Sequence, residues 1–235
     1  MSNRYFPFHA LGFRCNPFRT LTDDEWADIA VLPESIQALL QNGFAHLQIL
    51  GEPGYGKTTI LLALAAKFRA QGKRVEYEYL PEDQSQFKTD CVGLDVFVLD
   101  EVQRLVSSER ERLIGIAHHT QLIIASHEDL TPLFASHNLG FTSVQIENSD
   151  SGVLRTILSR RLDYFRQVAL KSDMRDSSLR KERSAQNDSQ IDFSPDAIVY
   201  LSNMFRGNLR AMEQFLYEVF QRLDRAEIID VERLK

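Results

Sequence analysis

Residues 51–59 read Gly51-Glu52-Pro53-Gly54-Tyr55-Gly56-Lys57-Thr58-Thr59, and this run determines the architecture that we expect. It matches the phosphate-binding loop pattern G-x-x-x-x-G-K-[ST] at every fixed position. A strand pattern over 45–50 precedes it, and a helix pattern from Thr58 to about Ala70 follows it. Such a loop arranges backbone N–H groups and a helix N-terminus around an anion. We therefore predict that 51–59 binds the phosphates of a nucleotide, with Lys57 at the β- and γ-phosphates and the Thr58 hydroxyl on Mg²⁺.

Length and charge restrict the class of protein. A chain of 235 residues accommodates one α/β domain and a small appendage. A net charge of −6 argues against tight DNA binding by a lone monomer, but it leaves open a basic surface that forms on assembly. We see no membrane-spanning run and no signal peptide, so we expect a cytoplasmic protein. Cys15 and Cys91 form no CxxC pair and the histidines are scattered, so we expect no disulfide framework and no structural metal.

Two further strand patterns end in polar residues. Residues 94–101 are an almost continuous apolar run, typical of a strand buried on both faces of a parallel sheet, and they end in Asp100 and Glu101. In enzymes with this loop the first acid holds Mg²⁺ through water and the second positions or activates the attacking water. We assign these roles to Asp100 and Glu101. Residues 121–127 end in Ser126 and His127, either of which is expected near the γ-phosphate, although His127 is equally compatible with a helix cap or a loop.

The remaining patterns predict the domain organisation. Residues 1–34, rich in aromatics and proline, are an arm that packs on the core or partly covers the adenine base. Residues 35–149 form the core, and 150–235 form a helical lid with a flexible polar insert over 171–192, for which a solvated linker is favoured over a basic partner-binding segment. The other expected strands are 74–80 and 142–146. The expected helices are 35–41, 107–119 with a capping box, 129–136, 151–170, 195–205 and 209–223, with a strand or turn and a helical fragment over 226–235.

This order of elements resembles the AAA+ ATPases over nearly the whole chain. The Walker A match is 51–58, the Walker B match is 96–101, and the sensor 1 position falls at Ser126 or His127. Gly207-Asn208-Leu209-Arg210 resembles the sensor 2 motif, which would place Arg210 over the γ-phosphate; otherwise Arg210 is a surface arginine of a lid helix. The resemblance implies an α/β fold with a parallel five-stranded sheet flanked by helices and a small C-terminal helical lid. It also implies ATP and Mg²⁺ as cofactors and a homo-oligomer that forms on ATP binding.

Within the AAA+ proteins, the chain resembles the initiator-related branch, which includes ExeA-type secretion ATPases and TniB-type transposon target-selection ATPases. In that branch an N-terminal segment lines the adenine site, so the resemblance makes Pro17 and Phe18 candidates there. The likeness rests on three runs: Gly12-Phe13 with Asn16-Pro17-Phe18, Asp100-Glu101-Val102-Gln103, and Gly207-Asn208-Leu209-Arg210.

The chain also departs from the AAA+ pattern. The family often has an arginine just before the last strand, where it serves a neighbouring subunit, but residues 134–141 contain none. Such an arginine is worth about 10³–10⁵ in rate, so hydrolysis is slow or the arginine comes from elsewhere, such as Arg160 or Arg161. The segment between the second and third strands, where relatives often carry a pore or DNA loop, is short, which argues against a threading motor.

These features predict an ATP-binding, Mg²⁺-dependent ATPase that acts as a nucleotide-dependent switch. It would assemble on DNA or a partner protein in transposition, secretion or defence, without a membrane. The main alternative is a nucleotide-gated adaptor with little or no hydrolysis, which the missing arginine favours. A kinase of small metabolites shares the phosphate-binding loop, but the Asp100-Glu101 pair and the sensor-2-like lid argue against it.

Overall fold

The computed structural model describes residues 7–147, 150–167 and 191–235. The chain forms two compact units, which we call the core unit (21–148) and the helical unit (1–20 with 149–235). The predicted arm, 1–34, is therefore divided: its first 20 residues belong to the helical unit and the rest to the core unit. Among the described residues, no helix is both long and apolar enough to cross a membrane.

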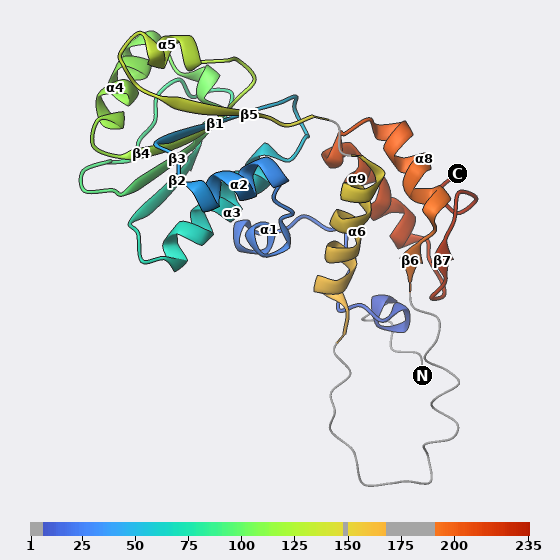
Figure 1. Ribbon diagram of the computed structural model, residues 1–235. Coiled ribbons are helices and arrows are strands. Elements are labelled where there is room, and N and C mark those ends of the chain that lie inside the picture. The colour runs from blue at the N-terminus through green and yellow to red at the C-terminus, as the bar shows by residue number, and fades with distance from the viewer. Residues whose placement is uncertain (1–6, 148–149, 168–190) are drawn as a thin grey trace, which may run out of the picture. The chain divides into compact units, whose positions relative to one another are not determined.

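Five parallel strands form the sheet of the described core unit, in the order β2-β3-β4-β1-β5 (Figure 1). All five were predicted from the sequence. Because the strands are parallel, their carboxyl ends meet at one edge of the sheet, and the segments that follow β1, β3 and β4 are neighbours there. The strands are β1 (His46–Leu50), β2 (Val75–Tyr79), β3 (Val96–Asp100), β4 (Gln121–Ser126) and β5 (Phe141–Gln145).

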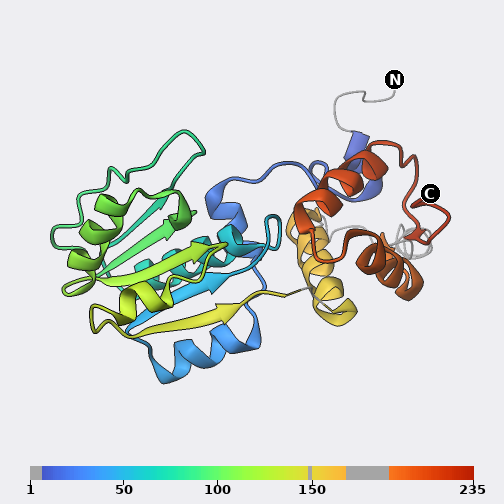
Figure 2. The ribbon, with the colours of Figure 1, turned by 90° about the horizontal axis from the view of Figure 1, so that it is seen from above.

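Helices cover both faces of this sheet (Figure 2). One apolar cluster joins α2 (Glu34–Asn42) and α3 (Lys57–Ala70) to one face, and α1 (Asp23–Ile29) packs against α3. A second cluster joins α4 (Ser107–Ala117) and α5 (Thr131–Ala135) to the other face. Strand β3 is buried along its whole length, which explains its near-continuous apolar sequence. The result is the predicted α/β architecture with a sheet between two helical layers.

The helical unit contains α6 (Ser151–Phe165), α8 (Pro195–Phe205) and α9 (Leu209–Gln221). Each begins at a side-chain cap: Asp150, Ser194 and Asn208 accept hydrogen bonds from first-turn N–H groups. A short parallel pair, β6 (Asp192–Phe193) and β7 (Ile228–Ile229), joins them, and the N-terminal segment adds a 3₁₀ turn, η1 (Pro7–Leu11). The helical unit thus combines the predicted C-terminal helices with N-terminal residues.

Several predicted boundaries were wrong. Helix α4 begins after Val106, which offers no side-chain cap, so the predicted capping box at Ser107 does not form in this described segment. Helix α6 ends at Phe165, not at residue 170, because Arg166 takes an extended conformation (ψ 141°) and forms a bridge with Phe13. Residues 171–190 of the predicted insert lie outside the described residues, whereas Asp192 already belongs to β6. The described residues after β7 form turns, not a helix.

Candidate nucleotide-binding site

The loop after β1 has a backbone that suits glycine at three positions. Gly54 and Gly56 have φ values of 84° and 88°, in the left-handed region that other residues avoid. At Gly51 a Cβ would lie 2.9 Å from the carbonyl oxygen of Ile146, too close for any side chain. Helix α3 starts directly after Gly56, and in this described part of the chain no side chain caps it. Its first N–H groups, which have no acceptor within the helix, therefore suit an anion held against the loop.

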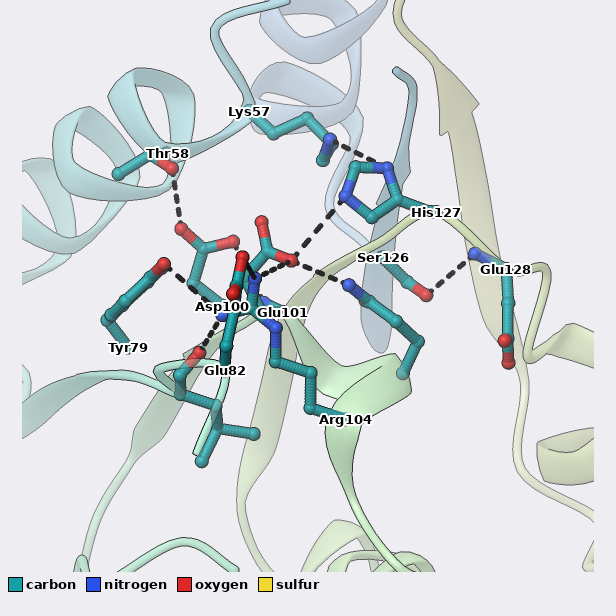
Figure 3. A network of polar contacts seen from close by, with 12 residues as sticks. Lys57, Thr58, Tyr79, Glu82, Asp100, Glu101, Arg104, Ser126, His127 and Glu128 are labelled. Atoms are coloured by element: carbon teal, nitrogen blue, oxygen red, sulfur yellow. Dashed lines mark hydrogen bonds and ion pairs between the residues drawn. The ribbon is translucent and has the colours of Figure 1, made fainter. Parts of the chain in front are cut away.

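Lys57 lies across this loop. Its Nζ donates to the carbonyl oxygens of Gly51 at 2.7 Å and Glu52 at 3.1 Å, and the residue is only 5% exposed. The same Nζ lies 3.4 Å from Nδ1 of His127. The loop carbonyls therefore hold the ammonium group at the carboxyl edge of the sheet, in contact with the residue that follows β4 (Figure 3).

Asp100, the last residue of β3, is fully buried, and protein donors contact both of its oxygens. The Thr58 hydroxyl donates to Oδ2 at 2.6 Å, and the Tyr77 hydroxyl lies 3.5 Å from the same atom. The backbone N–H of Glu101 donates to Oδ1 at 2.9 Å. Burial raises the pKa of Asp100, while the hydrogen bond from Thr58 opposes that rise. The structure thus brings together the two predicted magnesium ligands, Thr58 and Asp100.

Glu101 does not continue β3, although the predicted strand included it. Its φ of 63° turns the chain sharply, so that Asp100 points toward Thr58 and Glu101 toward His127 (Figure 3). Oε2 of Glu101 accepts from Gln103 at 2.6 Å, pairs with Arg104 at 3.2 Å and lies 3.5 Å from Nε2 of His127. The two adjacent carboxylates therefore have separate environments, one beside α3 and the other beside the turn after β4.

His127 connects the loop to Glu101. Its Nδ1 lies 2.9 Å from the Gly51 carbonyl oxygen, which can only accept, so this contact requires the hydrogen on Nδ1. The Ser126 hydroxyl instead accepts from the backbone N–H of Glu128 at 2.9 Å. Of the two residues proposed for the sensor 1 position, only His127 touches the loop, while Ser126 holds the turn that carries it.

Four residues to which the sequence assigned no site role support this site. Tyr77 contacts Asp100, and Arg104 contacts Glu101, the Tyr79 hydroxyl at 3.2 Å and the Leu80 carbonyl. Gln103, next to Arg104, is the third. The fourth is Gln48, fully buried in β1, whose side chain bonds to Asp129 at 2.8 Å and to the Leu130 N–H at 2.9 Å. Gln48 thereby anchors the turn after β4. These contacts depend on the register of neighbouring strands and on tight turns, and a single sequence motif contains neither kind of information.

The other predicted site residues belong to the helical unit. Phe18 is 4% exposed because its ring packs against Phe193 and Phe220, and the Pro17 carbonyl accepts from Arg161 Nε at 2.6 Å. Arg210 is the exposed second residue of α9. The places of Pro17, Phe18 and Arg210 around a nucleotide stay predictions.

Arg161 was named in the sequence as a substitute for the missing family arginine, and that suggestion was wrong. The residue is 2% exposed, and its guanidinium donates to the carbonyls of Pro17 and Arg19 and lies 3.5 Å from a carboxylate oxygen of Glu213. A group buried in this way within its own subunit cannot reach a neighbouring one.

The donor set fits a magnesium nucleotide. Mg²⁺ prefers oxygen ligands and usually takes one or two from the protein, as the Thr58 hydroxyl and the Asp100 carboxylate would supply. The ammonium group of Lys57 and the N–H groups at the start of α3 match the negative charge of a polyphosphate.

No protein-family profile and no curated protein matches the chain. Among solved structures it is similar to AMPPCP-bound DnaA from Aquifex aeolicus, with 20% identity and a TM-score of 0.52 over 80% of this chain, which spans 60% of that DnaA. It is also similar to a RuvB variant from Thermotoga maritima, with 17% identity and a TM-score of 0.56 over 93% of this chain and 71% of that one. It is similar as well to domain III of the Thermotoga maritima replication initiation protein DnaA, with 15% identity and a TM-score of 0.54 over 92% of this chain and 96% of that one. At such identities the likeness concerns the fold alone, and it identifies the fold of this chain as that of the AAA+ P-loop ATPases.

Proposed function

We propose that the chain binds ATP with Mg²⁺ and hydrolyses it as a nucleotide-dependent switch. The observation that carries this proposal is the 2.6 Å contact between Thr58 and Asp100 beside the Lys57 loop. It places a hydroxyl and a carboxylate suited to one cation next to donors suited to a polyphosphate. Likeness to the AMPPCP-bound DnaA supports nucleotide binding.

The residues would divide the work as follows. The α3 N-terminus and Lys57 would bind the phosphates, and Thr58 and Asp100 would hold Mg²⁺, which neutralises developing charge during phosphoryl transfer. Glu101 would orient the attacking water, and Arg104 and Gln103 would fix its carboxylate. Arg210 would contact the nucleotide from the lid. We further propose that ATP binding promotes a homo-oligomer that acts on DNA or on a partner protein.

Replacement of Glu101 tests the enzymatic part of this proposal. We expect Glu101→Gln to bind ATP normally but to release phosphate about 10²–10⁴-fold more slowly, because the amide cannot take a proton from water. Glu128→Gln, at an exposed acid of the neighbouring turn, is the matched control and should keep wild-type turnover. Undiminished phosphate release by Glu101→Gln would show that another base acts.

A nucleotide-gated adaptor with little hydrolysis is the second candidate, and the burial of Arg161 favours it. With no arginine in 134–141 and Arg161 committed within its own unit, the chain has fewer groups to complete a neighbour's site. Phosphate release with ATP alone and with ATP plus double-stranded DNA separates the candidates. Stimulation by DNA supports the switch, whereas equally negligible release in both supports the adaptor. Strong turnover only with a small acceptor would support a kinase instead.

A further inference from the structure

Charge is segregated between the two units. The core unit contains 9 basic residues (lysine and arginine) and 19 acidic residues, which give a net charge of −10. The helical unit contains 18 basic and 14 acidic residues, which give a net charge of +4. The acidity of the whole chain therefore belongs to the core unit. By net charge a nucleic acid would meet a more favourable field at the helical unit than at the core unit, so the overall charge of −6 does not describe the surface that such a partner would meet.

The N-terminal 20 residues contain three arginines and no acid, and two of these arginines, Arg14 and Arg19, lie in the described part of the helical unit. The Arg14 N–H donates to the Phe165 carbonyl at 3.0 Å, and the Gln167 N–H donates to the Gly12 carbonyl at 2.9 Å. These backbone bonds, together with the bonds from Arg161 to the Pro17 and Arg19 carbonyls, hold this segment against the C-terminal half of α6.

Two arginines and two aromatic rings meet at this contact. The Arg14 guanidinium lies 4.8 Å from the centre of the Tyr164 ring, and the Arg19 guanidinium lies 5.0 Å from that of Phe165. Arg160 is exposed and precedes Tyr164 by four residues, so the two share a face of α6. Arg14 is exposed too, and in the described ranges no acidic side chain forms an ion pair with it. We call Arg14, Arg19, Arg160 and Tyr164 the cation–aromatic surface.

We propose that the cation–aromatic surface binds the phosphodiester backbone of a nucleic acid. A guanidinium group matches phosphate oxygens in a bidentate manner, and the exposed Arg14 and Arg160 would make these contacts, whereas Arg19 already donates to the Thr20 carbonyl oxygen at 2.6 Å. Contacts of this kind carry no base information, so binding is independent of sequence and falls as salt rises. This proposal adds to the proposed function a location for its contact with nucleic acid. It rests on the proposed function only in taking nucleic acid as the class of partner.

Fluorescence anisotropy of the full chain with a labelled random-sequence DNA duplex, over a salt series and without nucleotide, tests the proposal. We expect the wild-type chain to bind and Arg14→Glu with Arg160→Glu to bind about tenfold more weakly, with a salt slope smaller by about two. The control, Arg222→Glu with Lys235→Glu, changes the charge of the helical unit equally and should stay within about twofold of wild type. Arg14→Lys with Arg160→Lys keeps the charge, so it should keep the salt slope of wild type, but it should bind more weakly than wild type because an ammonium group cannot form the bidentate contact.

The outcomes are distinct. Absence of wild-type binding, equal loss in both charge-reversed variants, or binding only to phosphatidylserine vesicles would overturn the proposal. Tighter binding of an RNA duplex of the same sequence, lost in the same variant, would support the surface and identify RNA as the source of the phosphodiester. Calorimetry with ATP on the same proteins keeps the two proposals apart: if no protein binds ATP, the proposed function fails, while the DNA data still decide the surface.

Discussion

Glu101 has a left-handed backbone (φ 63°), a conformation that costs a residue with a side chain about 1–3 kcal/mol. Directly before it, Asp100 is still in strand geometry and fully buried. The turn gives the two neighbouring carboxylates different partners, Thr58 for the first and Arg104 with His127 for the second. Strain at this residue fits the division of work that we propose, one acid for the metal and one for water.

Thr58 provides a test of the proposed metal site. We expect Thr58→Ala to weaken Mg²⁺-dependent ATP binding about tenfold or more, because it removes both a metal ligand and the 2.6 Å bond to Asp100. Thr58→Ser keeps the hydroxyl and should remain close to wild type. A magnesium titration of nucleotide binding measures the effect, and equal magnesium dependence in Thr58→Ala and Thr58→Ser would count against the assigned ligand.

His46 predicts a pH effect on stability. Burial, and secondarily His118, lowers its pKa, and its Nδ1 accepts from the Leu122 N–H at 3.0 Å. Because the folded pKa lies below 6.5, the unfolded state takes up the proton first. This contribution is therefore complete above about pH 6.5 and is lost as the pH falls toward the folded pKa. Urea unfolding from pH 8 to 5 should show a smaller decline in His46→Asn, which keeps an acceptor and does not titrate; parallel declines would refute the assignment.

The sequence alone predicted the residues that meet at the candidate site, but not those that hold them in place. Lys57, Thr58, Asp100, Glu101 and His127 lie at the ends of strands or in a recognisable loop, and the structure brings all five together. Arg104 and Gln48 act through partners that depend on where a turn and a strand place them. Such side-chain pairings are tertiary, so periodicity does not reveal them.

Among the elements, α6 shows what local patterns miss. Its apolar spacing suggested a helix to residue 170, yet it ends at Phe165, where backbone bonds to Gly12 and Arg14 replace helical ones. The partner segment lies about 150 positions earlier in the sequence, so no window around α6 contains the signal. The same contacts explain why the first 20 residues belong with the C-terminal helices.

Arg161 should be essential to this packing. Burial already raises the pKa of Glu213 to about 7, and removal of Arg161 would leave this carboxyl group without its buried partner. Removal would also leave the carbonyl oxygens of Pro17 and Arg19 without this donor. We expect Arg161→Ala to lower the free energy of unfolding of the helical unit by about 3–5 kcal/mol. Arg160→Ala, at the exposed preceding position of the same helix, should change it by less than about 0.5 kcal/mol. Urea unfolding compares the two, and similar values would disprove a structural role for Arg161.

At the scale of the whole molecule, the order of strands and helices was predictable because parallel strands with buried faces have a distinctive composition. The division into units was not, because it joins the two ends of the chain. That division also changes the meaning of the charge: an acidic total of −6 conceals a basic helical unit. The net charge of a whole chain is therefore a poor description of its units when segments far apart in the sequence assemble into one unit.

The central claim is that the loop after β1 and the two acids at the end of β3, Asp100 and Glu101, bind a magnesium nucleotide. Isothermal titration of ATP with excess Mg²⁺ tests it most directly in three proteins: wild type, Lys57→Ala, and Lys67→Ala as an exposed control on the same helix. We predict equal affinity for wild type and Lys67→Ala, and a loss of about 100-fold for Lys57→Ala, since a charged donor to the phosphates is removed. Wild-type affinity in Lys57→Ala, or no binding by the wild-type protein, would contradict the claim.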